Sequence, residues 1–368
     1  MDLIATIEDL IRFRTETGNA TEIAKATQYI KDKFAHISVQ VEIFQRDASP
    51  VVFLRNADTL DFDVLVLGHI DVVPAADEMF EPRIDNGKMF GRGTLDMKSF
   101  AAVALNSMEY VITHKLPLKF GVVLSTDEEK GSKSTESFLA AYPEIKARIV
   151  LDNDVGGDIT KIVSKCKNPV FVKLIAEGKE AHGSTPWDGV DANELLMQAW
   201  QNIRRIYPYF SAELPMPNDK WIDTVHFAKI EGGQVSNIIS NYAEALLDFR
   251  LTEDSTVENL QKNLQKCLPN GVSYKIVSAS TPVVMDEDNP DILDYKRFAE
   301  NIMGRKIEFE HIGGATDSRA FAVKGSTVIM HSGTGEGMHA SGEYVELESV
   351  KQIADIQIKF LEHLAAKK

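Results

Sequence analysis

The alternation of short apolar runs with longer helical patterns constrains the fold more than any other feature of this sequence. Residues 51–54, 64–67 and 120–124 are continuously apolar, as is typical of strands buried on both faces of a sheet. Helical patterns lie at residues 19–34, which open with a capping box, and at residues 97–112. Strands that alternate with helices in this way predict an α/β fold, in which a mixed sheet carries helices on both faces.

A different order of elements begins after residue 158 and indicates a second domain. The expected elements are a strand at 171–176, a helix at 193–206, strands at 225–230 and 244–251, a helix at 257–267 and a strand at 273–277. This β-α-β-β-α-β order is that of an α+β, ferredoxin-like unit. We therefore expect residues 165–279 to be inserted into a first domain formed by residues 1–164 and 280–368.

The size and charge of the chain limit its class and its partners. Its 368 residues suggest two domains, and 40 Lys and Arg against 55 Asp and Glu give a net charge of −15. Nucleic acids and anionic membranes both need a basic binding face, so we expect neither as the main partner. No apolar run approaches the ~18 residues of a membrane-spanning helix.

The N-terminus and the cysteine content bear on the cellular compartment. The first residues are acidic and amphipathic, and they lack the basic start and long apolar stretch of a signal peptide. Cys166 and Cys267 form neither a disulfide framework nor a Cys-X-X-Cys motif, which favours free thiols in a reducing compartment. We therefore expect a cytoplasmic protein.

Histidine and carboxylate residues recur just past the ends of the apolar runs. In open α/β sheets, ligands collect outside the carboxyl ends of the strands, so these side chains are expected to share one cleft. The candidates are His69 and Asp71 after residues 64–67, Glu128 and Glu129 after residues 120–124, and Asp152, with Asp154 as a near competitor, after residues 149–151.

Two further candidates lie in glycine-rich segments. Asp96 stands between Gly91-Arg-Gly93 and the start of a helix, and His339 lies in a loop after residues 327–330. Taken alone, Asp96 is as well explained as a helix N-cap, and Glu128-Glu129 as a solvated acidic loop. Taken together, the residues predict a site for two cations, about 3.5–4 Å apart, that clamp a water and a carbonyl oxygen. Oxygen and nitrogen ligands without Cys suit two Zn²⁺ ions, with Co²⁺ or Mn²⁺ as alternatives.

Six motifs resemble those of a known family in the same order, over nearly the whole chain. They occupy residues 68–74 (GHIDVVP), 90–98 (FGRGTLDMK), 125–129 (STDEE), 181–186 (AHGSTP), 231–237 (EGGQVSN) and 313–319 (GGATDSR). The family is that of the di-zinc metallopeptidases and amidohydrolases, which includes aminoacylase, carboxypeptidase G, peptidase T, carnosinase, acetylornithine deacetylase and succinyl-diaminopimelate desuccinylase. The resemblance implies a zinc-exopeptidase-like catalytic domain with an inserted lid and dimerisation domain.

The resemblance also implies a role for each metal-site residue. Asp96 would bridge both metals, with a cis peptide bond to Met97. His69 and Asp152 would complete one metal site, and Glu129 and His339 the other. Asp71 would orient His69. Glu128 would be the general base that takes a proton from the bridging water and returns it to the leaving amine.

Three further residues are implied to act on the substrate. Asn237 would bind it, and Arg319 would pair with a substrate carboxylate. His182 would reach the cleft of the partner subunit in a homodimer formed by the inserted domain, where it would stabilise the oxyanion. If the protein were a monomer, His182 would have no cleft to serve. Closure of the inserted domain would expel water.

The substrate class stays open between two alternatives at this point. Members that remove acyl groups or act as carboxypeptidases usually have Glu as the fourth ligand, whereas this chain has Asp in residues 150–156 (VLDNDVG). That Asp favours a short peptide, while Val72-Val73-Pro74 and the compact length resemble the desuccinylase and deacetylase branches. The expected function is therefore a zinc-dependent hydrolase of a short peptide or an N-acyl amino acid. A non-catalytic binding protein on the same fold, or a metal-free α/β binding protein, are the competing interpretations.

Overall fold

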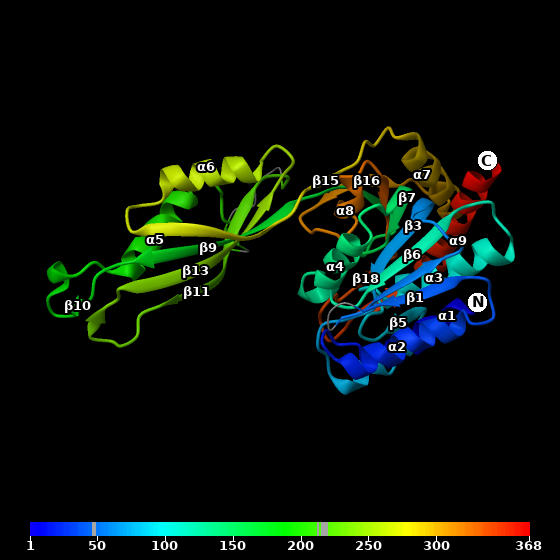
Figure 1. Cartoon of the computed structure of the whole chain (residues 1–368), viewed down its shortest axis with the longest axis horizontal. Coiled ribbons are helices and arrows are strands. Elements are labelled where there is room, and N and C mark those ends of the chain that lie inside the picture. The colour runs from blue at the N-terminus through cyan, green and yellow to red at the C-terminus, as the bar shows by residue number, and fades with distance from the viewer. Residues whose placement is uncertain (46–48, 212, 215–219) are drawn as a thin grey trace. The chain divides into compact units, whose positions relative to one another are not determined.

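The chain divides into two compact units in the computed structural model, which describes residues 1–45, 49–211, 213–214 and 220–368 (Figure 1). Unit 1 comprises Met1–Ser164, Met285–Glu310 and Thr316–Lys368. Unit 2 comprises Lys165–Val284 and His311–Ala315. The sequence placed the end of the insertion at residue 279 and did not expect the short second segment. In that segment, the carbonyl of Ile312 accepts the N–H of Lys167, a residue of unit 2, at 3.2 Å.

A mixed nine-stranded sheet has most of its strands in unit 1, while β15 and the last residues of β8 and β16 fall within the bounds of unit 2. The strand order is β1-β2-β6-β3-β7-β17-β8-β15, with β16 paired to β8. β3 is parallel to β6 and β7, and β7 is parallel to β17, whereas β1, β2 and β6 pair in antiparallel fashion. The strands are β1 Gln40–Phe44, β2 Val51–Arg55, β3 Asp61–His69, β6 Phe120–Ser125, β7 Lys146–Asp152, β8 Lys161–Cys166, β15 Val283–Val284, β16 Glu308–Ile312 and β17 Thr327–Met330.

Helices cover this sheet, and α1, α2, α3, α7 and α9 share one apolar cluster with it. All six residues of β6 are buried, which explains its continuous apolar sequence. α3 packs against β3, β6, α1 and α9, and α4 and α8 contact other strands. The helices of unit 1 are α1 Leu3–Arg12, α2 Ala20–Lys33, α3 Lys98–Thr113, α4 Lys133–Ala141, α7 Pro290–Met303, α8 Arg319–Ala322 and α9 Leu347–Ala366. This architecture confirms the predicted mixed α/β fold.

A second, small sheet in unit 1 was not expected from the sequence. Its strands are β4 Arg83–Asp85, β5 Lys88–Phe90, β18 Gly335–Glu336 and β19 Tyr344–Glu346, in the order β18-β19-β5-β4. The pairing of Tyr344 with Phe90 and of Glu346 with Lys88 joins two segments that are far apart in the sequence. Because β5 leads into the loop of Asp96, and the loop between β18 and β19 carries His339, this sheet brings two candidate residues together.

Unit 2 has the element order predicted for the insertion. Its four-stranded antiparallel sheet runs β11-β13-β9-β14, the order that two split β-α-β crossovers produce. The helices α5 and α6 share an apolar core with this sheet. The elements are β9 Asn168–Glu177, α5 Ala192–Ile203, β11 Thr224–Gly232, β13 Tyr242–Leu251, α6 Val257–Cys267 and β14 Val272–Ala279, with β10 Ala181–His182 and β12 Ile238–Ile239 as a separate pair.

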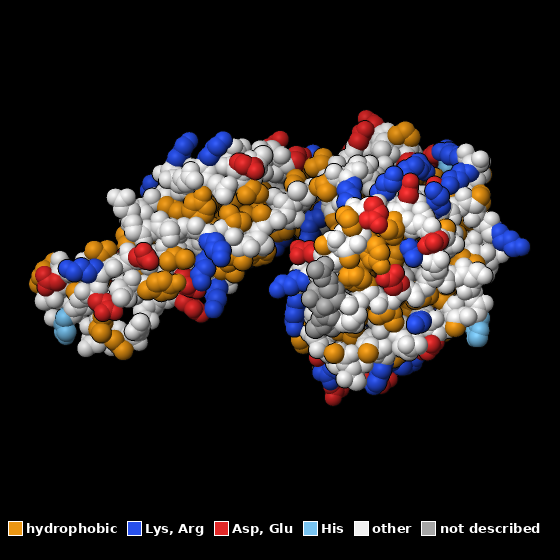
Figure 2. Space-filling view, viewed as in Figure 1, with side chains coloured by type: hydrophobic (Ala, Val, Ile, Leu, Met, Phe, Trp, Pro, Cys, Tyr) orange, Lys and Arg blue, Asp and Glu red, His pale blue; other side chains and the backbone are white. Residues whose placement is uncertain are grey.

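The solvent-exposed surface carries charges of both signs on each unit. Figure 2 shows Lys and Arg interspersed with Asp and Glu over the visible face. In unit 2, the sheet carries such pairs: Lys173 lies 2.7 Å from Glu244, and Lys229 lies 2.6 Å from Glu231. Among the described residues, no helix combines the length and the apolar character that crossing a bilayer requires.

The buried His331 is expected to make the stability of unit 1 depend on pH. It follows β17, is fully buried, and its Nε2 lies 2.7 Å from the carbonyl oxygen of Ile159. Burial lowers the pKa of His331 to about 4, whereas an exposed histidine has a pKa of about 6.5. The unfolded chain therefore binds a proton more readily than the folded one, and protonation favours unfolding as the pH falls from about 6.5 to about 4.

Protonation of His331 is expected to lower the free energy of unfolding by an amount on the order of 3 kcal/mol between pH 6.5 and pH 4. We expect His331→Gln to lack this effect, so that its free energy of unfolding depends less on pH than that of the wild type. Urea unfolding at several pH values between 7 and 4 measures the difference. The exposed His36, changed to Gln, is the control. Equal slopes in the wild type and in His331→Gln would contradict the assignment.

Candidate active site

Asp96 lies at the centre of the predicted site and faces two histidines. Its Oδ1 is 3.0 Å from Nε2 of His69, and its Oδ2 is 3.0 Å from Nε2 of His339. The residue is 6% exposed, and its peptide bond to Met97 is cis. Because each oxygen of one carboxylate has a different histidine beside it, Asp96 is shared by two groups of possible metal ligands.

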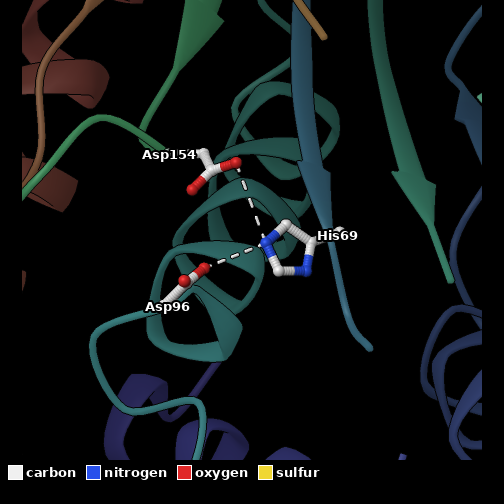
Figure 3. Close-up of side chains that lie close together, drawn as sticks. All are labelled: His69, Asp96 and Asp154. Atoms are coloured by element: carbon white, nitrogen blue, oxygen red, sulfur yellow. Dashed lines mark hydrogen bonds and ion pairs between the residues drawn. The ribbon is translucent and has the colours of Figure 1, made fainter. Parts of the chain in front are cut away.

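The first group consists of His69, Asp96 and Asp154 (Figure 3). His69 is the last residue of β3, and its Nε2 lies 3.8 Å from Oδ2 of Asp154. Its other ring nitrogen, Nδ1, lies 3.0 Å from the carbonyl oxygen of Asp71 and 3.4 Å from the carboxylate of that residue. An Nδ1–H that donates to Asp71 leaves Nε2 free to bind a metal, which is the tautomer that such a site needs.

The second group consists of Asp96, Glu129 and His339. Nε2 of His339 is 3.0 Å from Oε2 of Glu129. The other oxygen of that carboxylate, Oε1, is buried and has no hydrogen-bond partner among the described residues. A buried carboxylate oxygen without a donor is costly unless a cation is beside it.

Asp154, the near competitor of Asp152, is grouped with His69 and Asp96 in the structure, whereas the carboxylate of Asp152 has other partners. Asp152 was preferred because it directly follows the apolar run 149–151. In the structure, Asp152 is the last residue of β7, and its carboxylate accepts the hydroxyl of Thr316 and, at 2.9 Å, the N–H of Asp154. Asp152 thus forms the turn that directs Asp154 toward His69.

Asp71 holds the two consecutive glutamates in place, in addition to contacting His69. Its Oδ1 accepts the N–H of Glu128 at 3.1 Å, and its Oδ2 accepts the N–H of Glu129 at 3.3 Å. The hydroxyl of Thr17 also donates to Oδ2, at 2.7 Å. One buried carboxylate therefore fixes the backbone of the pair, so that the side chains of Glu128 and Glu129 take separate positions.

Glu128 lies beside the first group without belonging to it. Its Oε2 is 4.0 Å from Nε2 of His69, and its side chain is 26% exposed. Burial raises the pKa of Glu128 to about 7, while the attraction of His69 opposes this shift. A carboxylate at this position is within reach of a water near His69, as a general base requires.

The surrounding charges suit a cation. Burial, followed by repulsion from Asp96, raises the pKa of Glu129 to about 7 and raises that of Asp154 well above its usual value. Carboxylates crowded in this way resist ionisation until positive charge is added. Neutral imidazole nitrogens and carboxylate oxygens are the ligands of catalytic zinc, so the residues present fit the metal that the resemblance implied.

The residues predicted to bind substrate belong to both units. In unit 1, Arg319 opens α8, and its Nη1 donates to the carbonyl of Thr316 at 2.9 Å. In unit 2, His182 is exposed on β10, and the next residue, Gly183, donates its N–H to the carbonyl of Asn237 at 2.8 Å. The structure therefore places His182 and Asn237 close together within unit 2.

Sequence reasoning missed Glu343, a buried residue beside the site. Its carboxylate accepts hydrogen bonds from the backbone of the loop that carries Asp96 and pairs with the guanidinium of Arg92. Its sequence signal was weak: a single acidic residue four positions after His339, in a glycine-rich loop.

Comparison with known proteins identifies the family. Residues 65–363 match the profile of peptidase family M20/M25/M40. The chain is 25% identical to the acetylornithine deacetylase of Shigella sonnei over 379 residues, which cover 95% of this chain and 92% of that protein.

Two solved structures share the fold over nearly their whole length. The M20 family metallo-carboxypeptidase Sso-CP2 of Sulfolobus solfataricus has a TM-score of 0.80 at 18% identity and covers 100% of both chains. The aminopeptidase PepT of Bacillus cereus has a TM-score of 0.79 at 19% identity, covering 99% of this chain and 98% of that one.

The fold and the grouped carboxylates and histidines define a metallohydrolase. Within that class, the chain belongs to peptidase family M20/M25/M40. This membership confirms the resemblance seen in the ordered motifs, and it confirms that the protein is a hydrolase.

Asp154→Asn and Asp152→Asn distinguish the two possible ligands. If both groups bind a metal ion, we expect Asp154→Asn to hold one ion fewer than the wild type, because an amide is a poorer ligand than a carboxylate. Asp152→Asn is expected to retain both, because the amide oxygen can still accept the N–H of Asp154 and the amide nitrogen can donate to the hydroxyl of Thr316. Metal content by mass spectrometry after dialysis measures the difference. Loss of an ion only in Asp152→Asn would restore the assignment made from the sequence.

Proposed function

We propose that this protein is a two-zinc hydrolase that cleaves an amide bond of a short peptide or an N-acyl amino acid. The observation that carries the proposal is the position of Asp96, whose two oxygens each lie 3.0 Å from a different histidine. His69 and Asp154 would hold one ion with Asp96, and Glu129 and His339 the other. Co²⁺ or Mn²⁺ would suit the same donors.

The chemistry is divided between the metal and the protein. Bound zinc polarises a carbonyl and lowers the pKa of water. Glu128 accepts the proton of the attacking water and returns it to the leaving amine. Asp71 supports the reaction by holding the backbone of Glu128 and the ring of His69.

The substrate is the finer part of the proposal, and two classes have support. The fourth ligand is an aspartate, as in the aminopeptidase and dipeptidase branches that the sequence resembles, and this favours a short peptide. The identity to an acetylornithine deacetylase favours an N-acyl amino acid as the second candidate. In either case, the guanidinium of Arg319 suits a substrate carboxylate.

Unit 2 is proposed as the lid and dimerisation domain. The exposed His182, close to Asn237, would act on substrate in the cleft of the partner subunit, where its ring would stabilise developing negative charge. If the protein sediments as a monomer, no partner cleft is available, and this role of His182 is excluded. Cys166 and Cys267 form no disulfide, which fits a reducing compartment, so we also propose the cytoplasm as the location.

Glu128→Gln tests the proposed general base. We expect it to lower kcat about 10²–10⁴-fold while both zinc ions remain bound, because the amide cannot take up the proton. Activity and metal content are measured on the same preparation. Glu129→Gln is the matched control, and it is expected to lose metal as well as activity. Full activity in Glu128→Gln with both metals bound would refute the mechanism.

A hydrolysis screen of the zinc- or cobalt-loaded protein tests the substrate class. Dipeptides and tripeptides with free amines are compared with N-acetyl and N-succinyl amino acids at equal concentrations. We expect a higher kcat/KM for the free-amine peptides. Cleavage of the blocked amino acids alone would instead identify a deacylase and would show that the aspartate ligand does not mark a peptidase.

A further inference from the structure

The carboxylate of Glu343 accepts several hydrogen bonds from the backbone segment that leads to Asp96. The side chain is 1% exposed. One carboxylate oxygen, Oε1, accepts the N–H groups of Gly93, Leu95 and Asp96 at 3.0, 2.9 and 3.2 Å. The other oxygen pairs with the guanidinium of Arg92. A single side chain therefore fixes the course of the backbone up to Asp96.

The same residue is tied to the histidine on the other side of Asp96. Glu343 follows His339 by four residues in the loop between β18 and β19, and β19 pairs with β5. In addition, the carbonyl of Glu343 accepts the N–H of Gly91 at 3.2 Å. Glu343 thus joins the loop that carries His339 to the loop that carries Asp96, next to the point where their side chains lie 3.0 Å apart.

The two groups of metal ligands differ in how much they depend on such a link. In the first group, His69 ends a central strand of the large sheet and is fully buried. In the second group, His339 lies in a loop, has a left-handed backbone with φ of 62°, and has a side chain that is 50% exposed. The position of His339 therefore depends on the attachment of its loop, whereas the sheet itself holds His69.

We propose that Glu343 is a positioning residue that selectively sets the affinity of the second metal site, formed by Asp96, Glu129 and His339. The inference rests on the proposed two-metal function. Glu343 does not itself contact the metal or the substrate. It holds Asp96, which both groups share, and the loop of His339, which only the second group uses. Two of the three ligands of the second group therefore depend on Glu343, whereas His69 and Asp154 of the first group do not contact it.

Stepwise cobalt binding to the full-length apoprotein tests the inference, because visible absorption reports each bound ion. In Glu343→Gln, we expect the first binding step to match the wild type and the second to weaken about 10–100-fold, as is usual when a residue that supports a ligand is lost. Glu336→Gln, an exposed residue in the same segment, should leave both steps unchanged. His339→Ala marks the loss of the second step.

Two further variants separate positioning from a general structural role. Glu343→Asp keeps the negative charge beside Arg92 but shortens the side chain, so the selective loss should recur even if Glu343→Gln does not fold. Arg92→Lys keeps a cation and the backbone hydrogen bonds of Glu343, so the second step should persist. Excess cobalt should restore kcat in Glu343→Gln without a change in KM.

The possible failures can be told apart. Equal weakening of both steps, or no weakening of either, in the folded Glu343 variants would overturn the inference and leave the proposed function intact. A wild-type protein that binds fewer than two cobalt ions would overturn both. The cobalt titration does not require activity, so a wrong choice of substrate cannot produce either of these two binding results.

Discussion

The carboxylate of Asp96 is the element on which the rest of the site depends. Its two oxygens lie between His69 and His339, and the two groups of ligands have no other residue in common. A nearly buried carboxylate surrounded by other carboxylates is unfavourable unless positive charge compensates it. The sheet, the glycine-rich turn and the small second sheet all serve to hold this one side chain where two cations can share it.

The supports around Asp96 come from two kinds of structure. Strand ends of the large sheet present His69 directly and carry Asp152, which forms the turn that directs Asp154. A loop presents His339, and buried carboxylates attach the neighbouring segments: Asp71 holds the two glutamates, and Glu343 holds the backbone of Asp96. Residues outside the two groups thus support the arrangement of the side chains within them.

The two units contribute different residues to the proposed function. All the proposed metal ligands, the base Glu128 and Arg319 belong to unit 1, so the proposed hydrolytic centre is complete there. Unit 2 contributes the neighbouring His182 and Asn237 from its β10 and β12 region. A metal centre confined to one unit allows the inserted unit to vary with the substrate while the chemistry is retained, which agrees with the variety of hydrolases in the family.

The sequence by itself determined the elements whose signals are local. Local patterns predicted residues 257–267 and 244–251 as a helix and a strand, which are α6 and most of β13, and the positions of His69 and Glu128 after apolar runs pointed to one edge of a sheet. Only the tertiary structure showed that Asp154 is grouped with His69 while Asp152 accepts other hydrogen bonds, because the direction of a side chain past a strand end depends on the turn that follows. It also revealed the small sheet and Glu343, because contacts between segments about 250 residues apart leave no periodic signal in either segment.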